Sequence, residues 1–276
     1  RTILKRKLML TQKTTFIMAV LILAVLAAVV FSLHWGTVSY SPREVLAVLT
    51  GKTADSTAET VLLRLRLPRI ILALLVGGAL AVAGVVFQGL FRNPLVEPYT
   101  LGVSGGAALG ISLGFLFGRY LPVQILPLLG FGGAWLAVGL AYSVARKQKI
   151  LKITYLLLIG VMISFICSSL IMLLLSVVNL SRFRAVVYWT MGSLQGSDPA
   201  LLWIVVPLIL AGVLLSMSRA WALNAFILGE EGAGHLGIEI EKEKRRLFFL
   251  GSLLAGTGVA AAGVIGFVGL LVPHTL

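Results

Sequence analysis

The sequence has 276 residues, of which 59% are hydrophobic and only 12% are charged, and 23 Lys and Arg against 10 Asp and Glu give a net charge of +13. A soluble domain is about half apolar and about a quarter charged. The basic residues lie between long uncharged runs instead of gathering on one polar face, which excludes a disordered basic tail and a nucleic-acid-binding domain.

Seven runs of 20 to 30 residues contain no Asp, Glu, Lys or Arg. A helix needs about 20 apolar residues to cross a hydrocarbon core about 30 Å thick, so each run predicts a membrane-spanning helix. Gly266, Gly269 and Pro273 interrupt the last run, which we interpret as one span followed by the start of another. We therefore expect an all-α, polytopic transmembrane bundle with seven spans and part of an eighth. The runs are 14–42, 70–91, 98–118, 120–145, 153–181, 199–218 and 247–276.

The charges also predict an orientation. The first run follows a basic start, and no small-residue cleavage site precedes Ser41, so we expect an uncleaved helix. With the amino terminus in the cytoplasm, 15 Lys and Arg fall inside and 8 outside, as the positive-inside rule requires. The inner segments are then 1–13, 92–97, 146–152 and 219–246, and the outer ones are 43–69, 119 and 182–198. Cys167 is the only cysteine and can form no intrachain disulfide.

Three arginines, Arg64, Arg66 and Arg69, gather at the start of the second span on the predicted outer side, against the positive-inside trend. One explanation is that they reach the lipid headgroups. The other is a docking surface for an acidic partner, because a planar guanidinium binds carboxylates with two hydrogen bonds. Short helices are predicted on the same side at 41–51, where Ser41, Pro42 and Glu44 form a capping pattern, and at 182–194, which is amphipathic.

Two motifs resemble catalytic sites without their context. Gly51-Lys52-Thr53 resembles the end of a P-loop, but the required glycine five residues earlier and the preceding strand are missing. Residues 102–106 match a nucleophile elbow in an apolar, helical setting that provides no partner residues. Glycines at every fourth position instead predict a seam that lets a neighbouring helix approach closely. They are Gly102, Gly106, Gly110, Gly114 and Gly118.

No feature of the sequence predicts chemistry within the chain. The three histidines have no metal-ligand spacing to one another or to Cys167, and no H-E-x-x-H motif occurs, so we expect no catalytic residues, no metal and no cofactor. No span interior carries an acidic residue, which disfavours an ion-coupled carrier. These absences favour a conduit that is driven from outside the chain, and a secondary carrier or channel and a membrane-embedded enzyme are the alternatives.

Half of the acidic residues lie between Glu230 and Glu243, in the longest predicted cytoplasmic segment. Residues 223–237 are too polar to span a membrane and too apolar to be a solvated linker. An ordinary helical loop is one explanation. The other is a pair of short helices that break at Gly229 and Gly237 and present an apolar face to a soluble subunit. That face would consist of Phe226, Ile227, Leu228 and Leu236.

Six stretches follow one another in a characteristic order along the chain: RLPR at 66–69, QGLFRNPLVEP at 88–98, LGVSGGA at 101–107, YWTMGSL at 188–194, LGE through LG at 228–237 and GFVGLLVPH at 266–274. Together they resemble the permease subunits of binding-protein-dependent ABC importers for iron–siderophore, haem, vitamin B12 and related metal chelates. The resemblance covers nearly the whole chain.

The resemblance implies a single permease domain, residues 1–276, in a family with ten helices, two of them beyond Leu276. It implies a lipid-embedded subunit of the bacterial cytoplasmic (inner) membrane that pairs with a second permease subunit, most simply as a homodimer. Further partners would be two ATP-binding subunits and an extracytoplasmic substrate-binding protein, with no role for nucleic acid.

The resemblance also assigns roles to residues. Arg66 and Arg69 would receive glutamates of the binding protein. The cytoplasmic gate would comprise Asn93, Leu95, Ile153 and Thr154, where Ile153 replaces the small polar residue common in the family. The ATPase would dock on a coupling segment, residues 223–246, through Leu228, Gly229, Glu230, Ala233, Leu236 and Gly237.

Overall fold

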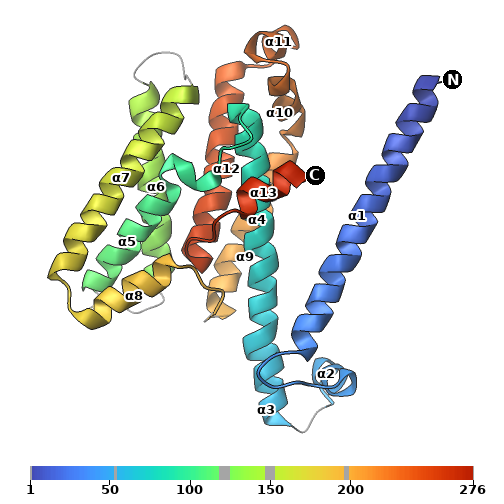
Figure 1. Ribbon diagram of the computed structural model, residues 1–276, viewed down its shortest axis with the longest axis vertical. Helices are drawn as coiled ribbons and strands as arrows, with labels where there is room; N and C mark the ends of the chain where they lie inside the picture. Colours follow the sequence, from blue (N-terminus) through green and yellow to red (C-terminus); the bar gives the residue numbers. More distant parts are fainter. Residues whose placement is uncertain (1, 53–54, 118–124, 147–152, 196–198, 276) are drawn as a thin grey trace. The chain divides into compact units, whose positions relative to one another are not determined.

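The computed structural model of the chain is shown in Figure 1. It describes residues 2–52, 55–117, 125–146, 153–195 and 199–275. All regular structure within these ranges is helical, which confirms the predicted all-α class. Backbone contacts divide the chain into two compact units, residues 1–71 and residues 72–276, and helix α4 runs from one into the other.

The first unit is organised around a short capped helix. Its elements are α1 (Thr2–His34), α2 (Pro42–Leu49), α3 (Ser56–Glu59), the π-helix η1 (Thr60–Arg66) and the first turns of α4 (Leu67–Phe91). The predicted capping box is confirmed, because the Ser41 hydroxyl accepts the Glu44 N–H at 3.3 Å and the Glu44 carboxylate accepts the Ser41 N–H at 2.7 Å. The second of these bonds lowers the pKa of Glu44. Beneath this helix lies a small core of Val45, Val48, Ala58 and Leu62.

The wide π turn of η1 has a local cause. Pro68 lies two residues after its end and has no N–H to give to the carbonyl four residues earlier, and its ring crowds that carbonyl. The N–H of Leu67 therefore bonds to the carbonyl of Leu62, five residues back, which widens the turn. Helix α4 then continues regularly to Phe91.

In the second unit the carboxy-terminal part of α4 packs against α10, α12 and α13. Helix α12 lies against α6 and α9, and α5, α6 and α7 pack against one another (Figure 1). Buried Phe87, Phe248 and Leu254 belong to its core. The elements are η2 (Pro98–Leu101), α5 (Val103–Phe117), α6 (Leu126–Arg146), α7 (Ile153–Val177), α8 (Leu180–Thr190), α9 (Pro199–Met217), α10 (Ala220–Ile227), α11 (Glu230–His235), α12 (Ile240–Ala262) and α13 (Val268–Thr275).

Five stretches in the described part of the chain are helices long and apolar enough to cross a membrane: Thr15–His34, Ser56–Phe91, Leu126–Arg146, Thr154–Val177 and Ala200–Met217. They correspond to five of the seven uncharged runs. The run at 98–118 contains only the 15 residues of α5, because Pro98 begins a separate 3-10 turn that ends at Gly102. The run at 247–276 is divided between α12 and α13, and α12 begins seven residues before it, within the charged segment.

The spaced glycines pack as a seam only in part. A Cβ atom added to Gly106, Gly110 or Gly114 would lie under 3.0 Å from atoms of α6, so two helices meet here at backbone distance. Gly102 was wrongly included in this row, because it precedes α5 in a left-handed conformation with φ of 85° and lies near the Gly160 carbonyl of α7. Gly118 lies outside the described residues.

The predicted amphipathic helix near residue 182 is present as α8. It begins two residues earlier than expected, because the Asn179 side chain accepts the Arg182 N–H and caps it. Arg182 also donates to the Leu116 carbonyl at 3.1 Å, at the carboxyl end of α5. The helix is therefore tied to the bundle at its start.

Candidate functional site

The charged segment between α9 and α12 forms two short helices, α10 and α11. Gly229 separates them with φ of 96°, and Gly237 follows the second with φ of 77°. These positive φ values strain any residue with a Cβ atom, and glycine adopts them without cost. The chain therefore turns sharply at both places where the sequence predicts breaks.

The side chains of this segment divide into two groups. Leu228 and Leu236 expose 70% and 63% of their surface. Phe226 was wrongly predicted to face a partner, because it is 2% exposed and belongs to the core under α10. Ala233 is fully buried, and the Ile227 side chain lies outside the described residues. Of the predicted apolar face, the side chains that are exposed within the described residues are thus the two leucines beside the glycine turns.

A buried lysine joins α11 to α12. Lys244 is 1% exposed, and its Nζ lies 2.7 Å from a carboxylate oxygen of Glu230 and 3.2 Å from one of Glu241. Glu230 is the first residue of α11, so its carboxylate also lies where the helix dipole favours negative charge. A lysine ammonium away from water requires such partners, because an unpaired buried charge costs several kcal/mol, about 3–5.

A second buried charge joins the start of α10 to α12. Only 5% of the Glu243 side chain is exposed, and one of its oxygens lies 3.3 Å from Arg219, directly before α10, and close to Arg246. Together the two clusters fix both short helices to the first turns of α12. In the sequence, these ion pairs appear only as a run of charged residues at 241–246. Such a run ordinarily predicts a face exposed to water.

The 92–97 loop, to which the resemblance assigns a gate, contains a turn closed by a side chain. The Asn93 side chain accepts the Leu95 N–H at 3.0 Å, and Leu95 is 77% exposed. Thr154 is exposed at the start of α7, and the side chain of Ile153 lies outside the described residues. Among the described residues, no hydrogen bond joins Asn93 or Leu95 to Thr154.

The stretches around 88–99 and 265–270 meet, although they are far apart in the sequence. The Tyr99 hydroxyl donates to the Ile265 carbonyl at 2.8 Å, and the Phe267 N–H donates to the Glu97 carboxylate at 2.8 Å. The Gln88 amide donates to the Leu270 carbonyl at 3.2 Å. These bonds hold the broken end of α12 and the start of α13 against the end of α4, without any catalytic grouping.

The two arginines proposed for docking differ in their surroundings. The Arg66 guanidinium donates to the backbone carbonyls of Leu33 and Val38 and lies 5.3 Å from the centre of the Tyr40 ring. Arg69 is exposed and has no hydrogen-bond or ion-pair partner among the residues the structure describes. Arg66 therefore holds the first unit together, whereas Arg69 is available to a partner.

No three His, Cys, Asp or Glu side chains gather within the described ranges into a group able to hold a metal ion. The arrangement offers exposed apolar and basic contact points on rigid helices, which suits binding more than bond-breaking chemistry.

Comparisons with known proteins match this construction. The FecCD transport family matches residues 21–276. The iron(3+)-hydroxamate import system permease protein FhuG of Bacillus subtilis (strain 168) is 34% identical over 271 residues, covering 96% of this chain and 80% of FhuG. The vitamin B12 import system permease protein BtuC of Serratia proteamaculans (strain 568) is 38% identical over 257 residues, covering 93% of this chain and 74% of that protein.

A solved structure has the same fold. It shows a metal-chelate type ABC transporter in an inward-facing conformation, with a TM-score of 0.84 and 32% identity over 95% of this chain and 80% of that one. The chain spans from 59% to 66% of the length of several other curated relatives that it matches.

The helices that can cross a membrane, together with the ion-paired segment at the end of α9, define a multi-pass membrane permease. The chain belongs to the FecCD transport family, as the resemblance in its sequence predicts.

Proposed function

We propose that this chain is the membrane-spanning subunit of a binding-protein-dependent ABC importer for metal chelates of the siderophore, haem or cobalamin kind. FhuG and BtuC are named for iron(3+)-hydroxamate and vitamin B12 import, and both ligands are bulky metal complexes. ATP would be hydrolysed by two separate subunits, and a second permease subunit would complete the pathway. The positive-inside bias supports an amino terminus in the cytoplasm.

The observation that carries this proposal is the exposed pair Leu228 and Leu236, which directly follow α10 and α11. Buried ion pairs join both short helices to α12. Exposed apolar side chains that polar residues surround mark a surface on which a partner can dock. The Lys244–Glu230 and Glu243–Arg219 pairs would then carry a push on α11 and α10 directly into α12. Closure of ATPase subunits would move the segment as a rigid lever, which is how packed elements transmit such changes.

Replacement of Leu236 by aspartate tests this contact. The change places an uncompensated charge in the ATPase interface and should weaken association of the ATPase subunits by about tenfold or more. Leu46 is a matched control, because it is also 63% exposed and lies in the first unit, on the predicted outer side. We expect Leu46→Asp to leave ATPase copurification unchanged. Normal copurification and ATP-dependent uptake with Leu236→Asp would contradict the proposal.

Uptake measurements on the same proteins separate an importer from a secondary carrier or channel. Proteoliposomes should contain the permease with the ATPase on the inner side of the membrane and the binding protein outside. They should accumulate chelate only when ATP is enclosed with the ATPase. Accumulation by the permease alone, driven by an ion gradient, would support the carrier instead.

Arginine docking to the binding protein can be tested one residue at a time. Arg69→Glu should reduce affinity for the binding protein by about threefold, because exposed ion pairs contribute at most about 1 kcal/mol each, and should leave the fold intact. Arg66→Glu should instead lower the free energy of unfolding by about 2 kcal/mol, because two charge-assisted bonds to backbone carbonyls are lost. Arg43→Glu, an exposed arginine on α2, controls for the change in net charge. Equal binding by Arg69→Glu and wild type would remove Arg69 from the docking surface.

A further inference from the structure

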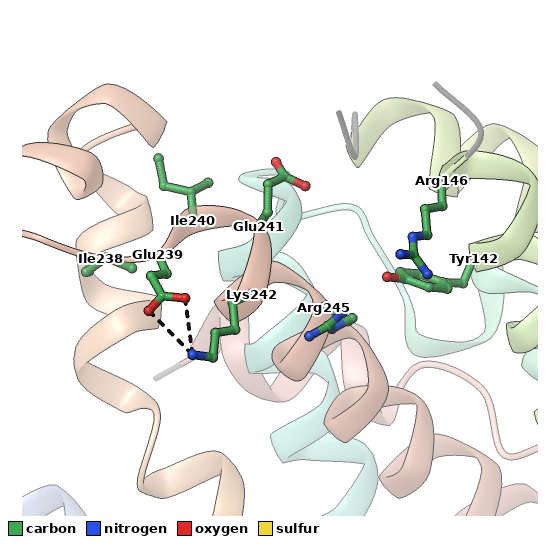
Figure 2. A pocket seen from close by; sticks show the side chains of 8 residues that line it. All are labelled: Tyr142, Arg146, Ile238, Glu239, Ile240, Glu241, Lys242 and Arg245. Carbon is green, nitrogen blue, oxygen red and sulfur yellow. Dashed lines mark hydrogen bonds and ion pairs between the residues drawn. The ribbon is translucent and has the colours of Figure 1, made fainter. Parts of the chain in front are cut away.

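A pocket with a cavity volume of about 600 Å³ opens between the end of α6 and the start of α12 (Figure 2). Its lining is mainly charged, unlike the apolar surface of the helices around it. The polar and charged side chains that line it are Tyr142, Arg146, Glu239, Glu241, Lys242 and Arg245.

The charges in this pocket do not balance. Glu239 accepts from Lys242 at 3.1 Å, and Glu241 lies 3.2 Å from the buried Lys244, so both carboxylates are already engaged. Arg146 and Arg245 come from two different helices, and neither has an ion-pair or hydrogen-bond partner in the part of the chain that the structure describes. The pocket therefore holds three cationic and two anionic side chains, and its two guanidinium groups are not paired with either carboxylate among the described residues.

An aromatic residue supplies a further donor at this place. The Tyr142 ring packs on Phe248 and Phe249, with ring centres 6.3 Å and 5.1 Å apart. Figure 2 shows this ring beside Arg146, with the hydroxyl directed toward the side of the pocket that α12 forms. Among the described residues this hydroxyl has no hydrogen-bond partner, so it can donate to a ligand.

The pocket lies at the end of a helix that can cross the membrane. Arg146 is the last residue of α6, and Gly139 and Gly132 precede it at intervals of seven residues, which places all three on one side of the helix. Nothing in the described chain lies within 4 Å of a Cβ atom added at either glycine, and the neighbouring Leu136 and Leu140 are 71% and 57% exposed. An uncovered apolar face thus runs along α6 up to the arginine.

We propose that this pocket binds the phosphodiester headgroup of an anionic phospholipid, whose acyl chains lie along the exposed face of α6. The arginine fork matches phosphate oxygens with paired hydrogen bonds, which the more compact lysine ammonium cannot do. Basic pockets between spanning helices bind such headgroups at the membrane surface. The proposal depends on membership in a membrane permease family and is independent of the substrate carried.

The test measures phospholipid binding to the purified permease in neutral detergent. Phosphatidylglycerol should remain bound in native mass spectrometry and raise the thermal unfolding midpoint, whereas phosphatidylcholine should do neither. The double variant Arg146→Gln/Arg245→Gln should lose at least about tenfold in phosphatidylglycerol affinity, because both charged forks are removed. Arg184→Gln, which removes an exposed arginine of α8, should bind like the wild type. The charge-retaining Arg146→Lys/Arg245→Lys should show an intermediate loss.

Three results would overturn the proposal. The first is unchanged phosphatidylglycerol affinity in the double glutamine variant. The second is equal stabilisation by inorganic phosphate at the same concentration, which would make the pocket a site for a soluble anion. The third is loss of the ATPase subunits with lipid binding retained, which would make the arginines a protein contact.

Discussion

Replacement of both Glu230 and Glu241 by glutamine is expected to lower the free energy of unfolding by about 3 kcal/mol, because the buried Lys244 ammonium loses both carboxylates. The measurement is a denaturant titration of the permease in mixed micelles. Adding Lys244→Met to this double variant should recover most of the loss, because methionine fills a similar volume and needs no counter-charge. A variant that stays as unstable after the methionine change would show that the lysine serves another purpose.

An exposed pair on the same helix provides the control. Lys242 and Glu239 lie 3.1 Å apart, but 42% and 71% of their side chains are exposed. Glu239→Gln should change stability by less than about 1 kcal/mol, because water already solvates both charges. A transport assay separates the structural role of the buried Lys244 ion pairs from their role in coupling. The triple variant should fold like the wild type and still transport less per ATP hydrolysed, because α11 is no longer joined to α12 by charge.

Gly110→Leu is expected to destabilise the permease by about 3 kcal/mol or more. A Cβ atom at this position would lie under 3.0 Å from the backbone of Leu129 on α6, so two helix backbones must separate. Gly132→Leu is the matched control, because a Cβ atom there meets nothing within 4 Å. Thermal unfolding of the two variants in the same detergent makes the comparison. Equal midpoints would show that α5 and α6 do not depend on close approach.

Local signals in the sequence predicted the elements well. The uncharged runs located the spans, because charged side chains are unfavourable at nearly every position of a helix inside the hydrocarbon core. The Ser41–Glu44 cap and the breaks at Gly229 and Gly237 follow from backbone requirements that a few neighbouring residues satisfy. Hydropathy alone predicted a span that begins at residue 98. It carries no information on backbone conformation, and the left-handed Gly102 delays the start of α5 to Val103.

Distant contacts could not be predicted in the same way. Arg66 bonds to carbonyls 28 and 33 residues away, and nothing in RLPR indicates that one arginine is engaged and the other is open. Phe226 and Leu228 look alike in the sequence, and only the packing of α10 buries one and exposes the other. The burial of Lys244 is likewise a tertiary property, since most lysines in charged runs are solvated.

The bond between Glu97 and Phe267 has a consequence for the order in which the protein is made. Phe267 adopts a φ of 69°, which costs a residue with a side chain about 1–2 kcal/mol, and the Glu97 carboxylate that accepts its N–H offsets this cost. Glu97 is synthesised 170 residues before the backbone that it holds. The bond can therefore form only after synthesis has passed Phe267, and the segment that ends at Glu97 is available long before the start of α13 reaches it.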